Sequence, residues 1–448
     1  MIINRQHYIQ QLENKSWNGK VKIITGIRRC GKSYLLSVLY KQYLMAKGVK
    51  EDCFVEIDLE KDDFALYRNP VILHKYIAER TNDKRRKYYV FIDEIQRSYK
   101  VRNSDIDIQS VPKEDRELLY TTFYDTLSSL MAQPNVDVYV TGSNSKMLSA
   151  DIVTNFRDRG SEIRVCPLTF AEYYPVSGLE KADALEQYLD FGGMPLAVLE
   201  PDEREKQKYL SDLHKNVYLK DIVERYHLKD DTIIDALTDT VYSAVGSLTN
   251  PHKLANATGS IMGKPTADST IKGYLDMLCD AYLIQAVDRF DIKGKRYFES
   301  IRKYYAMDLG LRNARLNFRQ VERSHLMENL IYLELIHRGY RVDVGVVDVK
   351  KIVAGKQQQS QYEIDFVVNT GRDKVYIQSA LNIDSPEKRA QETFSLHHTS
   401  DSFRKMVILD GNSRYRVDED GVAYIGVIPF LLQADLLEKL LLLSGKNG

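Results

Sequence analysis

The sequence predicts an α/β protein built on a parallel sheet, and three observations carry this prediction. Short apolar runs alternate with helical patterns through the first third of the chain, which is the order of strands and crossover helices. A motif typical of phosphate-binding loops follows the first apolar run and opens the first long helical pattern. A similar alternation returns near the C-terminus. We therefore expect a P-loop NTPase sheet, then a helical region, then a second α/β domain.

The composition is that of an ordinary globular protein. The chain has 448 residues, of which 44% are hydrophobic and 28% charged, so disorder cannot dominate. Lysine plus arginine and aspartate plus glutamate both number 63, which argues against a protein that coats nucleic acid through bulk positive charge. The four cysteines form no CxxC pair, and neither a signal peptide nor a membrane span is evident. We expect a cytoplasmic protein.

The elements of the first part follow from the positions of apolar runs. Helical spacing of apolar residues predicts a helix over 35–44, and Gly48 suits its end. The polar stretch 98–114 has little periodicity and predicts a surface loop inserted after the third strand. The expected strands cover 21–25, 53–57, 88–92, 136–141 and 161–166. The expected domains are 1–175 for the P-loop ATPase, 176–305 for a helical lid with a winged helix, and 306–448 for a C-terminal domain.

The phosphate-binding motif runs from Gly26 to Ser33 and fits GxxxxGK[ST] in full. Its glycines let the backbone curl so that N–H groups face the phosphates, and the following helix adds positive potential. Lys32 can reach the β- and γ-phosphates, while the Ser33 hydroxyl can ligate Mg²⁺. We therefore expect ATP and Mg²⁺ as cofactors. The residues predicted to bind the nucleotide here are Gly26, Arg29, Cys30, Gly31, Lys32, Ser33 and Tyr34.

Two carboxylates follow the third expected strand. Asp93 is predicted to hold Mg²⁺ together with Ser33, and Glu94 to polarise the attacking water. Phosphoryl transfer needs charge neutralisation and an oriented nucleophile, and these two acids can supply both. The alternative is an acidic strand end that faces solvent.

Polar and basic residues beyond the fourth strand extend the predicted catalytic set. Asn144 could act as a sensor of the γ-phosphate, because the carboxyl edge of a parallel sheet is its ligand edge. The alternative is a turn built from Gly, Ser and Asn. Arg157 or Arg159 could be donated to the ATP of a neighbouring subunit, which predicts a homo-oligomer. The alternative is a salt-bridged surface loop.

These motifs resemble the large family of bacterial and archaeal AAA+-like ATPases usually labelled only "ATP-binding protein", which join a P-loop domain to a C-terminal domain of unknown function. The resemblance implies ATP binding and hydrolysis in the N-terminal domain. In that family a Gly-Arg pair follows the sensor strand; here Asp158-Arg159 stands there, which favours Arg159 over Arg157 although the glycine is missing. The segments that carry the resemblance are 25–33 (TGIRRCGKS), 91–96 (FIDEIQ), 141–145 (TGSNS), 167–173 (PLTFAEY), 191–195 (FGGMP), 220–226 (KDIVERY), 327–330 (MENL) and 363–366 (EIDF).

The resemblance also implies a role for Pro195. The segment 193–195 is similar to a lid motif of related signalling ATPases, in which the proline packs near the adenine. We carry that role to Pro195; the alternative is a simple helix-breaking turn.

The middle of the chain predicts a winged helix. A helical pattern over 267–278 precedes two strand-like runs at 282–290 and 297–307. The hairpin between them is basic, which suggests a wing that contacts DNA phosphates. The alternative is a winged helix that packs on protein. The cations that carry the DNA hypothesis are Arg289, Lys293, Lys295 and Arg296.

The C-terminal part resembles the core of PD-(D/E)xK nucleases in a degraded form. Asp365 stands on a strand, but the next strand carries Gln378-Ser379-Ala380 where an active nuclease needs Glu-x-Lys. We expect a restriction-nuclease-like fold without nuclease catalysis. The functional hypothesis is a Mg²⁺-dependent ATPase that assembles as a motor or switch on an unknown macromolecule. The alternative is a DNA- or protein-binding module whose shape the nucleotide sets.

Overall fold

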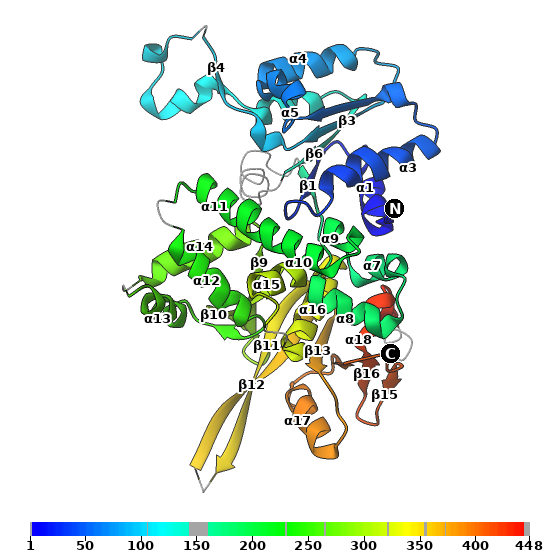
Figure 1. Cartoon of the computed structure of the whole chain (residues 1–448), viewed down its shortest axis with the longest axis vertical. Helices are drawn as coiled ribbons and strands as arrows, with labels where there is room; N and C mark the ends of the chain where they lie inside the picture. The colour runs from blue at the N-terminus through cyan, green and yellow to red at the C-terminus, as the bar shows by residue number, and fades with distance from the viewer. Residues whose placement is uncertain are drawn as a thin grey trace. The chain divides into compact units, whose positions relative to one another are not determined.

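The computed structural model describes residues 2–104, 106–142, 160–228, 231–263, 266–319, 322–353, 356–371 and 373–442. It divides into two compact units (Figure 1). The first unit holds residues 2–166 and 280–282, and the second holds 167–279 and the chain from 283 onward. Within the described residues, no helix combines the length and apolar character that a membrane span requires.

The first unit is built on a five-stranded parallel sheet with the order β2-β3-β6-β1-β7. The predicted strands are confirmed within one or two residues at each end. The central strands β1, β3 and β6 are buried along almost their whole length because both faces of a parallel sheet are covered. The strands are β1 (Val21–Thr25), β2 (Phe54–Asp58), β3 (Tyr88–Asp93), β6 (Val136–Thr141) and β7 (Gly160–Arg164).

The helices of the first unit follow local signals. The helix after the phosphate-binding motif is continuous from α2 through the π-helical η1 to α3, which confirms the prediction over 35–44. Asn69 caps α4, and Pro70 takes its first position, where a missing N–H is tolerated. The helical segments are α1 (Gln6–Lys15), α2 (Lys32–Tyr34), η1 (Leu35–Tyr40), α3 (Lys41–Ala46), α4 (Pro70–Arg80) and α5 (Phe123–Met131).

The predicted surface loop after β3 is a small arm. In the described residues, β4 (Val101–Arg102) pairs antiparallel with β5 (Tyr120–Thr121). The short 3-10 helices η5 (Ile108–Ser110) and η6 (Lys113–Leu119) lie between them. Its side chains are mostly exposed, in agreement with the polar sequence.

The second unit combines helices with a nine-stranded sheet of order β15-β16-β14-β13-β12-β11-β9-β10-β8. The helical segments are α7 (Phe170–Ser177), α8 (Lys181–Phe191), α9 (Pro195–Leu199), α10 (Glu203–Asp212), η8 (Leu213–Leu219), α11 (Lys220–Arg225), α12 (Thr232–Ser243), α13 (Pro251–Met262), α14 (Asp268–Asp280), α15 (Leu309–Arg315), α16 (Arg323–His337), α17 (Pro386–His397), α18 (Val427–Leu432) and α19 (Leu436–Leu442). The strands are β8 (Leu248–Thr249), β9 (Ile284–Asp291), β10 (Arg296–Ala306), β11 (Arg341–Val353), β12 (Lys356–Asn369), β13 (Lys374–Ala380), β14 (Arg404–Leu409), β15 (Arg416–Val417) and β16 (Val422–Gly426).

The β9–β10 hairpin is part of a larger sheet. β9 pairs with β10 on one side and runs parallel to β11 on the other, with Val344 opposite Arg289. The hairpin is therefore part of the sheet that continues into the C-terminal strands. The predicted division at residue 305 has no matching break in this sheet, and the three-part division stays a prediction.

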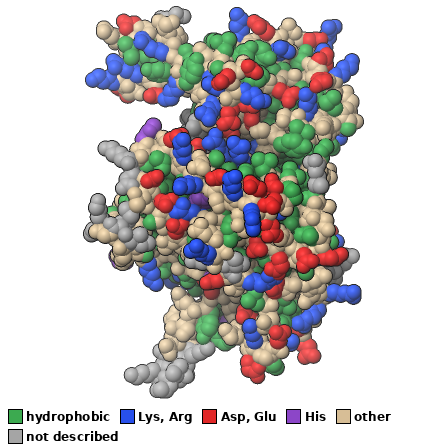
Figure 2. All heavy atoms as spheres, in the orientation of Figure 1, with side chains coloured by type: hydrophobic (Ala, Val, Ile, Leu, Met, Phe, Trp, Pro, Cys, Tyr) green, Lys and Arg blue, Asp and Glu red, His purple; other side chains and the backbone are tan. Residues whose placement is uncertain are grey.

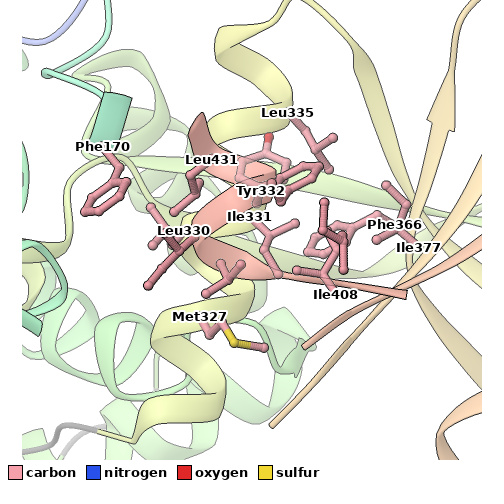
Figure 3. Packing of buried hydrophobic residues seen from close by; sticks show 14 of the residues in the cluster. Phe170, Met327, Leu330, Ile331, Tyr332, Leu335, Phe366, Ile377, Ile408 and Leu431 are labelled. Carbon is pink, nitrogen blue, oxygen red and sulfur yellow. The ribbon is translucent and has the colours of Figure 1, made fainter. Parts of the chain in front are cut away.

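The core of the second unit forms where α16 packs on the sheet (Figure 3). Leu330, Ile331 and Leu335 of α16 belong to one buried cluster with Phe366 and Ile377 of the sheet. Burial of each such side chain contributes about 1.5–3 kcal/mol. This packing fixes the rotation of α16 and so decides which of its side chains can turn toward β10 and β12.

Candidate functional site

The phosphate-binding loop lies between β1 and α2 at the carboxyl edge of the parallel sheet. Gly26 has φ +136°, and a Cβ atom there would lie 2.1 Å from the Val165 carbonyl oxygen, so only glycine fits. Gly31 has φ +96° immediately before α2, and Arg29 also adopts a left-handed conformation with φ +62°. The loop is thus curled as the motif predicts.

Lys32 folds back onto this loop. Its side chain is buried, and its Nζ atom donates hydrogen bonds to the carbonyl oxygens of Gly26 at 2.9 Å and Ile27 at 3.0 Å. These carbonyl groups are neutral, so they do not compensate the positive charge of the ammonium group. An anion in the loop would find this cation already in place.

The two predicted acids lie at the end of β3 and are held by β6. Thr141, the last residue of β6, donates its hydroxyl hydrogen bond to Asp93 and accepts one from the Glu94 backbone N–H at 3.0 Å. Gln96 donates to the Glu94 carboxylate. Glu94 has φ +51°, an uncommon conformation for a residue with a side chain. Thr141 therefore fixes both acids through one hydroxyl group.

The electrostatics tie these acids to the loop. Burial raises the pKa of Asp93, while hydrogen bonds from Thr141 and Ser33 and the charge of Lys32 oppose that rise. Burial also raises the pKa of Glu94, and the Lys32 charge is the main opposing influence. The structure therefore brings Ser33, Lys32, Asp93 and Glu94 into one site, although they come from two separate segments.

Arg5 is a site residue that sequence reasoning missed. Its buried guanidinium donates to the carbonyl oxygen of Cys30 in the loop at 3.1 Å and to that of Cys166 beyond β7 at 2.8 Å. It also lies 4.5 Å from the centre of the Tyr8 ring. Arg5 thus ties the loop to the chain that leaves β7. No local motif signals this, because the three segments are far apart in sequence.

The remaining nucleotide-binding predictions are placed as follows. The Cys30 side chain is fully buried and its Sγ lies 3.3 Å from the Val165 carbonyl oxygen, so the thiol packs inward. Tyr34 is exposed on α2. Asn144, Arg157 and Arg159 lie outside the described residues, and their roles stay predictions.

Pro195 is the first residue of α9, in the second unit. The preceding Gly193 donates its N–H to Asp308 at 2.8 Å, and its carbonyl accepts from Leu168 at 2.8 Å. A Cβ on Gly193 would lie 2.0 Å from the Leu168 carbonyl oxygen. These contacts explain the Gly-Gly-Met-Pro segment as a tight turn, and the adenine contact stays a prediction.

The hairpin cations are less available than the sequence suggested. Arg289 is only 7% exposed, and its guanidinium lies 4.9 Å from the centre of the Phe298 ring, so the prediction of a surface contact from Arg289 is wrong. Strand pairing on both sides of β9 is the reason. Lys293 donates to the Asp348 carbonyl oxygen at 2.8 Å, and Arg296 pairs with Asp291 at 3.3 Å. Lys293, Lys295 and Arg296 remain exposed.

A second group of acids lies in the second unit around Lys303 of β10. The Lys303 Nζ lies 2.8 Å from Glu328, 2.6 Å from Glu363 and 3.7 Å from Asp365. Asp365 also accepts from the Ser379 N–H at 2.8 Å. In the part of the chain that the structure describes, no three His, Cys, Asp or Glu side chains are arranged to hold a metal ion. The loss of nuclease catalysis stays a prediction.

Comparison with known proteins agrees with the geometry of the loop. Residues 18–174 match the profile of an AAA domain, and residues 182–322 match a domain of unknown function, DUF8612. Among solved structures, a Walker-type ATPase of Pyrococcus abyssi is 14% identical, and the match covers 70% of this chain and 96% of that one at a TM-score of 0.45. The Orc1 protein of Aeropyrum pernix, solved in complex with DNA, is 12% identical, covering 71% and 93%, at a TM-score of 0.26. Both scores are too low to support a conclusion about this chain.

Two relatives match along most of their length. An uncharacterised protein of Methanocaldococcus jannaschii is 26% identical over 402 residues, which cover 87% of this chain and 80% of that protein. An uncharacterised protein of Haemophilus influenzae is 30% identical over 437 residues, which cover 96% of this chain and 99% of that protein. The chain therefore belongs to the same family as this Haemophilus influenzae relative, and its residues 18–174 match an AAA domain.

Proposed function

We propose that the first unit is a Mg²⁺-dependent ATPase. The observation that supports this most is the meeting of the curled loop, Lys32, Ser33 and the acids Asp93 and Glu94 at one edge of a parallel sheet. This edge is where α/β proteins bind their ligands. The Lys32 cation and the two carboxylates do not neutralise one another at this edge. The cation can therefore bind an anion, and the carboxylates can bind a second cation.

Each group has a defined task in this proposal. The loop N–H groups and the Lys32 ammonium bind the phosphates, because both present positive charge to the space that the loop encloses. Glu94 orients the attacking water and takes up its proton. Burial raises the pKa of Glu94, which suits a group that must accept a proton near neutral pH. Thr141 and Gln96 hold the acids in position.

The donors fit a magnesium ion. Ser33 is close enough to Asp93 to help lower its pKa, and both side chains offer the hard oxygen ligands that Mg²⁺ prefers. Mg²⁺ is normally held by one or two protein groups, phosphate oxygens and water, so two side chains are sufficient. When bound, the ion neutralises charge on the phosphates.

The test is to measure ATP binding by calorimetry and phosphate release by a coupled assay, both with and without Mg²⁺. Lys32→Ala should abolish binding or turnover, whereas Glu94→Gln should bind ATP and hydrolyse it slowly, by about 10²-fold or more. Lys100→Ala is a matched control, because Lys100 is an exposed partner of Glu117 on the arm. Normal turnover by Glu94→Gln would contradict the role assigned to this residue.

We also propose that the protein acts as a self-assembling motor or switch, with Arg159 reaching the ATP of a neighbouring subunit. This part depends on the family resemblance and on the Asp158-Arg159 pair. Turnover per subunit should rise with protein concentration if the active form is an assembly. Arg159→Ala should remove that rise and leave binding to isolated subunits intact. A flat profile in the wild-type protein would overturn the assembly proposal.

DNA is the second candidate target, because Lys293, Lys295 and Arg296 remain exposed on the hairpin. Figure 2 shows basic and acidic side chains interspersed over the visible face. We therefore expect any DNA binding to be local and steeply salt-dependent. Stimulation of turnover by DNA, lost in a triple Lys293→Gln, Lys295→Gln, Arg296→Gln variant, would support it. Binding that is insensitive to these substitutions would exclude this surface.

A further inference from the structure

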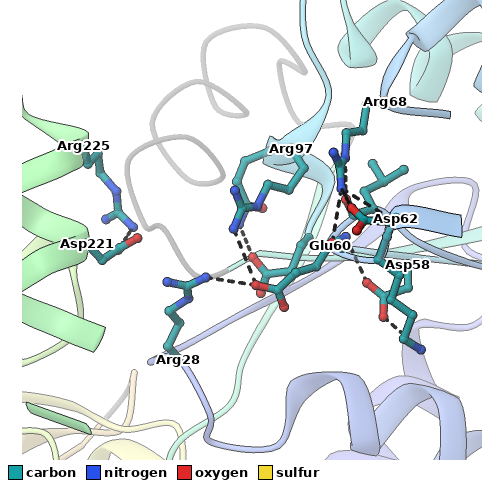
Figure 4. A network of polar contacts seen from close by, with 12 residues as sticks. Arg28, Asp58, Glu60, Asp62, Arg68, Arg97, Asp221 and Arg225 are labelled. Atoms are coloured by element: carbon teal, nitrogen blue, oxygen red, sulfur yellow. Dashed lines mark hydrogen bonds and ion pairs between the residues drawn. The ribbon is translucent and has the colours of Figure 1, made fainter. Parts of the chain in front are cut away.

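Two arginines share one glutamate beside the phosphate-binding loop (Figure 4). Arg28 belongs to the loop itself, Glu60 follows β2, and Arg97 ends the short helix η4 (Ile95–Arg97) after β3. The Nη2 atoms of Arg28 and Arg97 lie 3.2 and 3.5 Å from the same oxygen, Glu60 Oε1. One carboxylate therefore serves two guanidinium groups.

The position of Arg28 relates it to the catalytic acids. It lies in the curled loop between Gly26 and Gly31, at the carboxyl edge of the sheet where β3 leads into Glu94. Bound phosphates must lie between the loop and Glu94 if Glu94 is to direct water at them. Arg28 therefore stands on the side of the site where the terminal phosphate belongs.

Glu60 is not needed to hold the backbone in this region. Arg68, at the end of the short helix η3 (Asp62–Arg68), donates to the carbonyl oxygens of Leu59 at 2.8 Å and Glu60 at 3.2 Å. The Glu60 side chain itself is 54% exposed and that of Arg28 24% exposed. Partly exposed ion pairs of this kind are weak, so a highly charged ligand can displace one of the partners.

We propose that Arg28 contacts the terminal phosphate of the bound nucleoside triphosphate, and that Glu60 holds Arg28 aside until the nucleotide enters. The inference rests on the proposed ATPase function. A guanidinium binds phosphate oxygens through paired hydrogen bonds, and its charge stabilises the charge that develops on the transferred group. The Glu60 carboxylate competes with the phosphate for the same donors, and Arg97 keeps Glu60 paired once Arg28 has left.

The experiment compares affinity for a non-hydrolysable ATP analogue with affinity for ADP, together with turnover at saturating ATP. Arg28→Gln should weaken analogue binding about tenfold or more and slow turnover, with ADP affinity nearly unchanged. Arg28→Lys should restore part of the analogue affinity. Glu60→Gln should bind the analogue as tightly as the wild type or more tightly. Arg85→Gln is the matched control, because the Arg85 side chain is 92% exposed and pairs with the neighbouring Asp83.

The outcomes separate the two proposals. Equal weakening of analogue and ADP by Arg28→Gln would mean that Arg28 supports the loop and does not contact the terminal phosphate, which overturns the inference. Unchanged analogue affinity and turnover in Arg28→Gln would overturn it too. In both cases the ATPase proposal stands if the wild type binds and hydrolyses ATP. Failure of the wild type to bind either nucleotide removes the ATPase proposal, and the inference falls with it.

Discussion

The two units use the same side chains in opposite ways. In the first unit, Lys32 rests on neutral loop carbonyls while Asp93 and Glu94 are held by Thr141 and Gln96. In the second unit, Lys303 is only 2% exposed and lies within 4 Å of three acidic side chains, Glu328, Glu363 and Asp365. The first arrangement keeps cation and anions apart, whereas the second joins them.

This difference separates a site that can take a ligand from a cluster that stabilises a fold. Burial lowers the pKa of Lys303, but Glu328, Asp365 and Glu363 outweigh that effect and keep the amine charged. The charges of the cluster are thus satisfied within the protein. In the first unit the partners of Lys32 carry no charge, so phosphate oxygens offer it a stronger interaction than the loop does. Pairing within the protein, and not residue type, decides which group is poised for a ligand.

The largest expected effect comes from removing the cation of the cluster. Lys303→Met leaves a group of buried or half-buried acidic side chains without their cation and should lower the free energy of unfolding of the second unit by about 3–5 kcal/mol. Urea unfolding followed by circular dichroism measures this. Trp17 is the single tryptophan of the chain and lies in the first unit, so its fluorescence should report an unchanged transition there.

Lys208→Met is the matched control for that substitution. Lys208 forms an exposed ion pair with Glu205 on α10, which should contribute less than about 1 kcal/mol. Comparable destabilisation by the two substitutions would contradict the view that Lys303 is the electrostatic centre of the second unit.

A second prediction concerns the pH dependence of the same cluster. Burial, assisted by the Glu328 charge and opposed by Lys303, raises the pKa of Asp365 to about 8. The folded chain therefore holds a proton between about pH 4 and pH 8 that the unfolded chain has released. The free energy of unfolding should fall as pH rises through this window, by at most about 1.4 kcal/mol per pH unit. Asp365→Asn should flatten that slope when urea unfolding is repeated from pH 5 to pH 8; parallel curves would contradict the assignment.

A third prediction tests how the first unit holds its loop. Arg5→Lys keeps the positive charge but loses the forked guanidinium, whose two Nη atoms donate to the carbonyl oxygens of Cys30 and Cys166. We expect the first unit to lose about 1–3 kcal/mol, read from Trp17 fluorescence during urea unfolding, because two buried carbonyls lose a charged donor. Arg85→Lys at the exposed surface is the control and should leave the midpoint unchanged. An unchanged urea midpoint in Arg5→Lys would show that the two hydrogen bonds of the Arg5 guanidinium do not hold the loop.

The smallest expected effect sharpens the comparison most. Lys32→Ala should change the stability of the first unit by less than about 1 kcal/mol, because the loss of two hydrogen bonds to backbone carbonyls is offset by removal of a buried charge that no anion compensates. The same substitution should nevertheless remove nucleotide binding. A loss as large as that expected for Lys303→Met would mean that the two lysines play the same structural part.

Much of the first unit could be predicted because its signals are local. The strands β1, β3 and β6 are short runs rich in apolar residues, and the phosphate-binding motif has fixed spacing. Arg5 and Thr141 could not be found in this way, since each acts on residues distant in sequence. The burial of Arg289 in the hairpin could not be predicted for a similar reason. The alternating pattern of the hairpin is the same whether the outer edge of β9 faces solvent or pairs with β11, as it does here.

The sequence by itself determined the parallel sheet, the curled loop and the presence of a lysine, a serine and two acids at its edge, because periodicity and glycine spacing are properties of neighbouring residues. Only the tertiary structure decided which charges meet. It placed Lys303 of β10 among acids from α16 and β12, and it brought Glu60 and Arg97 to Arg28. Electrostatic interactions depend on distance in space and on burial, and neither follows from distance along the chain.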